Sequence, residues 1–152
     1  MSLVIFDLDG TLVTGPKGGF ANSVADQSFL PGVIEKCEEL KQRGIRIAIA
    51  TNQGGVPMGI VSEEATRARV DAAAQALGMD DYEMCMFHPQ AKLEKYRLSI
   101  LDCRKPSPYM LEQLMERLGA TPEETTMVGD RIEDMTAASL AGVRFAWSVD
   151  FF

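Results

Sequence analysis

The sequence lacks any apolar run close to the ~20 residues that a membrane-spanning helix needs, and its first residues lead into a short apolar strand rather than a signal sequence. Cysteine is also scarce. The three cysteines, Cys37, Cys85 and Cys103, are too few and too irregularly spaced for a disulfide framework. We therefore expect a cytoplasmic protein that does not contact a membrane and that keeps its thiols reduced.

The sequence has fewer basic than acidic residues, 15 against 22, and a net charge of −7. A surface that binds nucleic acid in general needs the opposite balance, so we do not expect a nucleic-acid partner. The chain of 152 residues is long enough for one domain that buries roughly 70% of the surface its unfolded form would expose. We expect a single domain over residues 1–152 that acts as a monomer.

Residues 3–12, LVIFDLDGTL, contain the most informative pattern in the chain. An apolar strand leads into Asp7 and Asp9, which alternation places on the same side of an extended backbone, and Gly10 then marks a sharp turn. Two carboxylates this close need a divalent cation with oxygen ligands, or protonation of one carboxyl, and both arrangements suit phosphoryl chemistry. A solvated turn with two incidental acids is the alternative for an isolated acidic pair.

Polar clusters follow two further predicted strands in the same way. The apolar residues 45–50 lead into Thr51, Asn52 and Gln53. Residues 125–128 lead into Gly129 and Asp130. Since the first strand also ends in polar residues, the same arrangement occurs three times along the chain.

The remaining sequence predicts two more strands and a set of helices. The strands are expected over residues 82–87, at an edge of the sheet, and over residues 143–148. Apolar periodicity and terminal signals predict helices over residues 31–44, 62–78, 107–119 and 133–140. Residues 13–30 and 88–104 have no sustained periodicity and are predicted to be loops.

Strands that alternate with helices predict an α/β fold with a doubly wound, mostly parallel sheet covered on both faces. Ligands of such sheets bind beyond the carboxyl ends of the strands, where the strand order reverses. This geometry would bring together Asp7, Asp9, Thr51, Lys105 and Asp130. Neither residues 13–30 nor residues 54–104 are long enough for a separate cap domain, so we expect an open site.

Four ordered pieces of the sequence resemble the haloacid dehalogenase superfamily over nearly the whole chain. They are Asp7-x-Asp9-Gly10-Thr11, Thr51-Asn52-Gln53, Lys105-Pro106 and Gly129-Asp130-x-x-x-Asp134. The closer likeness, carried by Thr51-Asn52-Gln53-Gly54 and Arg104-Lys105-Pro106, is to the branch of heptose-bisphosphate phosphatase, histidinol-phosphate phosphatase and the 3′-phosphatase of polynucleotide kinases. The resemblance implies a magnesium-dependent phosphomonoester hydrolase, and we expect its small phosphorylated substrate to be a sugar phosphate or similar metabolite.

The resemblance also implies the chemical roles of the acidic residues. Asp7 would be the nucleophile that forms an aspartyl-phosphate. Asp9 would protonate the leaving alkoxide and afterwards activate water. Magnesium would be bound by the carboxylate of Asp7, the backbone carbonyl of Asp9 and Asp130. Asp134 would orient the ligands or waters of the metal.

The other matching positions are expected to bind the substrate. Thr51, Lys105 and the backbone N–H groups that follow Asp9, at Gly10 and Thr11, would bind the transferring phosphoryl oxygens. The expected contacts to the rest of the substrate are Asn52, Gln53 and Arg104.

One departure from this branch concerns zinc. Its heptose-phosphatase members carry a zinc loop, C-x-H followed by C-x-C, just before R-K-P. Cys85 and Cys103 match the outer positions of that loop, whereas Phe87 and Leu101 replace two ligands and His88 only neighbours a ligand position. Two thiolates do not make the four-coordinate site that structural zinc prefers. We do not expect bound zinc, although Cys85, His88 and Cys103 can still lie close together.

Three alternatives to a metabolite phosphatase remain open at this point. A nucleic-acid 3′-phosphatase is compatible with the same motifs but is disfavoured by the net charge. A receiver-type phosphoacceptor domain also uses an aspartate on a doubly wound sheet, yet it would not need Asp9 as an acid. A binding protein without catalysis has no support in the motifs, since every catalytic position is filled.

Overall fold

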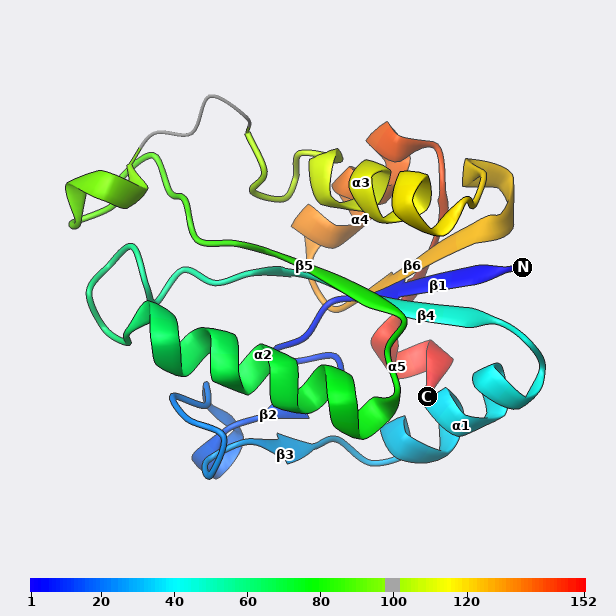
Figure 1. The fold of residues 1–152 in the computed structure, drawn as a ribbon, viewed down its shortest axis with the longest axis horizontal. Coiled ribbons are helices and arrows are strands. Elements are labelled where there is room, and N and C mark those ends of the chain that lie inside the picture. The colour runs from blue at the N-terminus through cyan, green and yellow to red at the C-terminus, as the bar shows by residue number, and fades with distance from the viewer. Residues whose placement is uncertain (98–101) are drawn as a thin grey trace.

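The computed structural model describes residues 1–97 and 102–152, which form a five-stranded parallel sheet with helices on both faces (Figure 1). The strand order is β5-β4-β1-β6-β7. The strands are β1 (Leu3–Phe6), β4 (Arg46–Asn52), β5 (Asp81–Cys85), β6 (Thr125–Gly129) and β7 (Arg144–Trp147). The predicted doubly wound α/β fold is confirmed, and β5 is an edge strand as the sequence predicts.

Two helices cover each face of the sheet. In Figure 1, α1 (Val33–Gln42) and α2 (Glu63–Leu77) lie below the sheet, and α3 (Tyr109–Leu118) and α4 (Ile132–Ala141) lie above it. The short helix α5 (Ser148–Phe151) follows β7, and three single-turn 3-10 helices occupy Pro16–Gly18, Glu94–Tyr96 and Pro122–Glu124. No helix among the described residues is long and apolar enough to cross a membrane.

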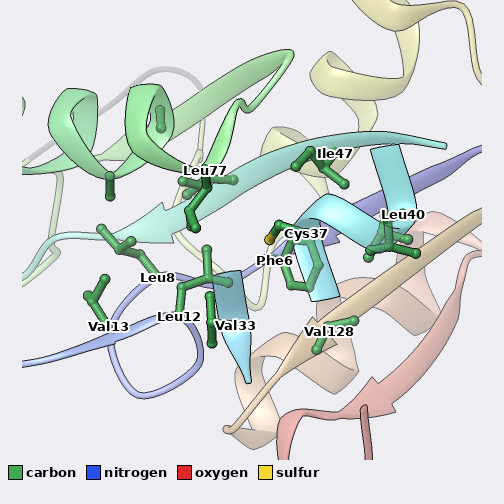
Figure 2. Close-up of a cluster of buried hydrophobic side chains, with 14 of the residues drawn as sticks. Phe6, Leu8, Leu12, Val13, Val33, Cys37, Leu40, Ile47, Leu77 and Val128 are labelled. Atoms are coloured by element: carbon green, nitrogen blue, oxygen red, sulfur yellow. The ribbon is translucent and has the colours of Figure 1, made fainter. Parts of the chain in front are cut away.

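The central strand β1 is buried on both faces, which explains its uninterrupted apolar sequence. Val4 and Phe6 belong to the cluster that packs under α1 and α2, shown in Figure 2, whereas Leu3 and Ile5 belong to the cluster under α3 and α4. Complete burial of each such side chain contributes roughly 1.5–3 kcal/mol, so β1 is held firmly in the middle of the sheet.

The strand order reverses at β1, because β1 pairs with β4 on one side and with β6 on the other. In this register Phe6 is opposite Ile49 of β4 and Val128 of β6. The residues that follow these positions therefore leave the sheet at the same edge. The predicted site lies at this edge.

Residues 13–30, predicted to be a loop, contain an antiparallel ribbon of β2 (Val13–Thr14) and β3 (Ser28–Phe29). This part of the loop prediction is wrong because strands of two residues are too short to produce an alternating pattern. Residues 88–104 contain the 3-10 helix at Glu94–Tyr96, and the predicted loop positions 98–101, including Leu101, lie outside the described residues.

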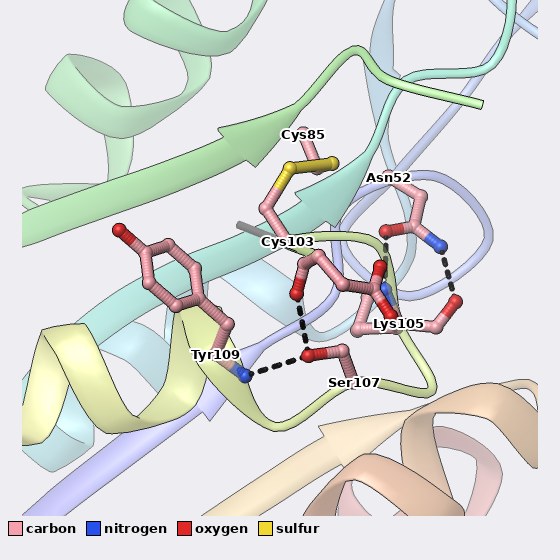
Figure 3. Close-up of a disulfide and its surroundings, with 7 residues drawn as sticks. Asn52, Cys85, Cys103, Lys105, Ser107 and Tyr109 are labelled. Carbon is pink, nitrogen blue, oxygen red and sulfur yellow. Dashed lines mark hydrogen bonds between the residues drawn. A yellow bond between two sulfur atoms is a disulfide. The ribbon is translucent and has the colours of Figure 1, made fainter. Parts of the chain in front are cut away.

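The expectation that all thiols are reduced is also wrong. Cys85, at the end of β5, and Cys103 form a disulfide with their Cα atoms 5.7 Å apart (Figure 3). Packing next to β5 brings Cys103 within bonding range of Cys85, although 18 positions separate them. Cys37 remains a free thiol buried in the core. Because their sulfurs bond to each other, Cys85 and Cys103 do not present the two thiolates that a metal shared with His88 would need.

Candidate active site

Side chains that follow β1, β4 and β6 meet at the carboxyl edge of the sheet and line a cavity of about 540 Å³. The lining includes seven residues that the sequence predicts for the site: Asp7, Asp9, Asn52, Gln53, Arg104, Lys105 and Asp134. Motifs far apart in the sequence thus converge where the strand order reverses, as expected for this type of sheet.

Four other predicted residues, Gly10, Thr11, Thr51 and Asp130, are not part of this lining. The fully buried Thr51 hydroxyl accepts a hydrogen bond from Gln53 Nε2 at 2.9 Å. Thr11 Oγ1 donates to Asp130 Oδ1 at 3.2 Å. Gly10 has a φ of +83°, and a Cβ there would overlap the carboxylate of Asp130. A glycine at this turn therefore leaves room for that acid.

Lys105 lies between two acids in the interior of the site. Its Nζ donates to Asp7 Oδ1 at 2.9 Å, to Asp134 Oδ1 at 2.6 Å and to the carbonyl oxygen of Ala50 at 2.8 Å. An ammonium group has three protons, so all of them are used. The buried lysine therefore connects the candidate nucleophile to Asp134.

Asp134 is itself positioned by the start of α4. Its second oxygen, Oδ2, accepts hydrogen bonds from the backbone N–H groups of Asp130 and Arg131, both at 3.2 Å. A carboxylate in the first turn is favoured because the backbone N–H groups there have no partner within the helix. At Gly129 a Cβ would overlap the Asp134 side chain, so this glycine permits the close approach.

The charges in this cluster change the proton affinities of its members. Burial raises the pKa of Asp7 to about 7; Lys105 opposes this shift and the nearby charge of Asp134 adds to it. Burial alone would lower the pKa of Lys105, but the attraction of Asp7 and Asp134 outweighs it and raises that pKa above its ordinary value. A single ammonium thus faces two buried carboxylates, and a further positive charge would stabilise both in the ionised form.

A divalent cation fits this cluster. Asp7, Asp130 and Asp134 each offer a carboxylate oxygen, and these atoms lie within 4.8 Å of one another. Among the described residues, they form the one group of at least three acidic, histidine or cysteine side chains close enough to share a metal. Carboxylate oxygens are the ligands that Mg²⁺ prefers. The Asp9 side chain is outside the group, so any contribution from Asp9 would come from its backbone.

Comparison with known proteins relates this site to a family. Residues 19–142 match the model of the haloacid dehalogenase-like hydrolases. The chain belongs to this family. It is 36% identical over 145 residues to the D-glycero-beta-D-manno-heptose-1,7-bisphosphate 7-phosphatase of Photorhabdus laumondii, covering 92% of this chain and 76% of that protein. The enzyme of the same name from Escherichia coli K12 is 32% identical, covering 92% of this chain and 74% of its own length.

A solved structure supports the same assignment. The D,D-heptose 1,7-bisphosphate phosphatase of B. bronchiseptica, crystallised with magnesium and phosphate, aligns with a TM-score of 0.79 and 28% identity. The alignment covers 95% of this chain and 79% of that one. Our hydrolase is accordingly a phosphatase of the haloacid dehalogenase type, which confirms the enzyme class predicted from the sequence and sets aside the receiver-type and non-catalytic alternatives.

The side chain of Asp9 has partners in this hydrolase that the sequence analysis did not identify. Arg69 of α2 contacts both of its carboxylate oxygens, and Gln53 contacts one of them. Gln27, in the segment before β3, contacts Arg69. The sequence contained one signal for Arg69: it is a charged residue at a position where helical spacing continues the apolar face of Val70, Ala73 and Leu77.

Two arginines lie at the cavity of this hydrolase, together with the acidic Glu133. Arg104 and Arg131 both line it, and Arg131 lies over the ring of the exposed Phe20, 5.7 Å from its centre. Burial lowers the pKa of Arg104, with Glu133 opposing the shift and Arg131 adding to it. Arg104 Nη1 is buried with no hydrogen-bond partner among the described residues. A ligand oxygen would satisfy it.

Proposed function

We propose that this phosphatase hydrolyses a phosphomonoester of a sugar or similar small metabolite through an aspartyl-phosphate on Asp7. The observation that carries the proposal is the buried contact between Asp7 Oδ1 and Lys105 Nζ, 2.9 Å long, beside the cavity. A cation fixed next to a carboxylate nucleophile supplies positive charge where phosphoryl oxygens would bind.

The reaction takes two steps at phosphorus. An oxygen of Asp7 first attacks the phosphorus atom, the bond to the alkoxide leaving group breaks, and the carboxyl group of Asp9 gives the alkoxide a proton. Water then attacks the same phosphorus atom, the Asp9 carboxylate accepts a proton from that water, and inorganic phosphate leaves Asp7. Lys105, Thr51 and the backbone N–H groups of Gly10 and Thr11 bind phosphoryl oxygens in this proposal.

Magnesium is the proposed cofactor. Asp7, Asp130 and the backbone carbonyl of Asp9 would hold it, and Asp134 would orient its ligands or waters. When bound, the ion supplies positive charge that offsets the phosphoryl oxygens and the clustered carboxylates. The proximity of the three carboxylates supports this assignment, as does the relative that was crystallised with magnesium and phosphate.

A second anionic group on the substrate is favoured by the wall of the cavity. Arg104 and Arg131 lie there, and Arg104 Nη1 has no hydrogen-bond partner in the part of the chain that the structure describes. Guanidinium groups bind carboxylate or phosphate oxygens well because their N–H donors are held in a fixed, planar fork. The relatives named as heptose-1,7-bisphosphate phosphatases would place a sugar bisphosphate among the substrates to try first.

A panel of phosphate esters tests the proposal. Sugar monophosphates, sugar bisphosphates, an aryl phosphate and a 3′-phosphorylated oligonucleotide are incubated with the protein, with and without Mg²⁺, and released phosphate is measured. We expect turnover of a sugar phosphate that requires Mg²⁺. Asp7→Asn should abolish it, because an amide is not a competent nucleophile. Asp150→Asn, at an exposed position in α5, is the matched control and should remain active.

Two results would contradict the proposal. Turnover by Asp7→Asn at the wild-type rate would remove the nucleophile assignment. Release from the 3′-phosphorylated oligonucleotide with negligible release from every sugar phosphate would favour the nucleic-acid phosphatase instead, which the net charge of −7 disfavours.

A further inference from the structure

Arg69 is a buried cation whose role the proposed chemistry leaves unexplained. It lies on the face of α2 that packs into the protein and is only 4% exposed. A buried guanidinium is costly unless paired charges and hydrogen bonds compensate for its lost hydration. Its partners therefore indicate why this position of an otherwise apolar helix face carries a charge.

The main partner of Arg69 is the carboxylate of Asp9. Arg69 Nη1 donates to Oδ1 at 2.7 Å and Nη2 donates to Oδ2 at 3.1 Å, so the contact is bidentate. Gln53 Nε2 donates to Oδ2 as well, at 2.9 Å. Every protein contact to these two oxygens among the described residues comes from an N–H donor. A carboxylate that only accepts hydrogen bonds matches this set of partners.

Arg69 is in turn held by two glutamines. Its Nη2 donates to Gln53 Oε1 at 2.8 Å, and its Nη1 donates to Gln27 Oε1 at 3.0 Å. Gln27 Nε2 also donates to the backbone carbonyl of Arg69 at 3.1 Å. The guanidinium plane is fixed from several sides, so it can fix the orientation of the smaller carboxylate that it contacts.

We propose that Arg69 is a positioning residue that holds the side chain of Asp9 in the orientation needed to accept the proton of the water that hydrolyses the aspartyl-phosphate. This inference rests on the proposed function. In that step the water oxygen bonds to phosphorus, one water proton moves to Asp9, and the bond between phosphorus and Asp7 breaks to release inorganic phosphate. Arg69 touches neither water nor phosphorus and acts through Asp9.

The assignment to the second step has a physical reason. Protonated Asp9, needed to assist the leaving group in the first step, would place an O–H among donors and lose part of the bidentate contact. The ionised form, needed in the second step, keeps every contact. Loss of Arg69 should therefore slow hydrolysis of the phosphoenzyme more than its formation.

The test is Arg69→Met, assayed with an aryl phosphate whose leaving group needs little protonation. We expect kcat to fall by at least about tenfold, since a fully lost general base costs about 10²–10⁴-fold. KM should fall with it, kcat/KM should change much less, and a burst of released phenol should precede the slow steady state. Arg69→Lys, which keeps a cation, should restore part of kcat.

Two controls separate positioning from general support of the fold. Arg67→Met removes an exposed arginine two positions earlier on α2, whose 3.0 Å ion pair with Glu63 lies outside the site, and it should leave kcat unchanged. In an Asp9→Asn background, Arg69→Met should cause little further loss of kcat, because the group through which it acts is already changed. If Arg69→Met does not fold, Gln27→Ala is the substitute test, because it removes two hydrogen bonds that hold Arg69. It should lower kcat less than Arg69→Met but with the same pattern.

Specific results would overturn the inference. Equal losses of kcat and kcat/KM without a burst would show that Arg69 does not act in the second step, and a full additional loss in the Asp9→Asn background would show that it does not act through Asp9. Failure of the wild-type protein to hydrolyse any ester would instead overturn the proposed function. The two failures are therefore distinguishable.

Discussion

The side-chain amide of Asn52 forms two hydrogen bonds with the backbone of Lys105, as Figure 3 shows. Asn52 Nδ2 donates to the Lys105 carbonyl at 3.0 Å, and the Lys105 N–H donates to Asn52 Oδ1 at 2.9 Å. The end of β4 thereby fixes the residue whose ammonium reaches Asp7. The sequence assigned Asn52 to substrate contact, and the structure gives its amide this supporting contact.

Asn52→Asp should displace Lys105, because a carboxylate cannot donate to the Lys105 carbonyl. We expect a loss of about 0.5–1.5 kcal/mol in the free energy of unfolding, the typical worth of the one hydrogen bond that is lost, together with a lower kcat. Chemical denaturation and steady-state assays measure the two effects. Asn22→Asp, at an exposed position of the same cavity, is the control for added charge. Unchanged stability in Asn52→Asp would contradict the supporting role.

Asp9→Asn should distinguish leaving groups. It keeps the backbone carbonyl assigned to magnesium but removes the acid, which is typically worth about 10²–10⁴-fold in rate. The loss of kcat/KM should be severe for a sugar phosphate, whose alkoxide needs a proton, and milder for an aryl phosphate. Equal fold-losses of kcat/KM on the two substrates would show that Asp9 is not the leaving-group acid.

Thermal stability should depend on a dithiol reductant and not on a zinc chelator. The disulfide between Cys85 and Cys103 closes a loop with a sequence separation of 18. From the loop-entropy relation, loss of this disulfide should lower the free energy of unfolding by about 3 kcal/mol. Calorimetry should detect a lower Tm in reductant, whereas Cys103→Ser should have the low Tm already and not respond further. One equivalent of tightly bound zinc by elemental analysis would contradict the expectation that this loop is held without metal.

Arg117→Met should destabilise the contact between α3 and the edge strand in a pH-dependent way. Arg117 Nε donates to Asp81 Oδ2 at 2.8 Å, and Arg117 also contacts Glu83. The hydrogen bond from Arg117 lowers the pKa of Asp81 below its ordinary value of 3.8, although partial burial opposes this shift. Since the folded-state pKa is depressed, the stabilisation is present above pH 3.8 and is lost as pH falls through the folded-state value.

We therefore expect Arg117→Met to be about 0.2–1 kcal/mol less stable than wild type at neutral pH, the range for exposed ion pairs, and nearly as stable as wild type at pH 2. Urea denaturation at several pH values measures the difference. Arg144→Met is the control, because Arg144 is exposed on β7 and has no ion pair among the described residues. A difference that grows as pH falls would contradict the sign of this linkage.

The sequence by itself determined the succession of the main strands and helices along the chain. It also determined which acidic residues follow the ends of the strands. These features depend on local patterns: an apolar run that ends in Asp7 and Asp9 carries its own signal, and so does a strand that leads into Gly129 and Asp130. Once a parallel sheet was inferred, the convergence of its carboxyl ends followed from geometry. The ribbon of β2 and β3 was missed because two residues are too few for a periodic signal.

Tertiary structure alone decided which partners these acids have. Arg69 reaches Asp9 across 60 positions and Lys105 reaches Asp7 across 98, so neither contact leaves a pattern in neighbouring residues. The same holds for Cys85 and Cys103, whose bond depends on how the chain passes β5. Such contacts depend on strand register and helix packing, which bring distant side chains within hydrogen-bond or covalent range. The pairing of each candidate acid with its partner, and the part played by Arg69, therefore became visible only in the folded chain.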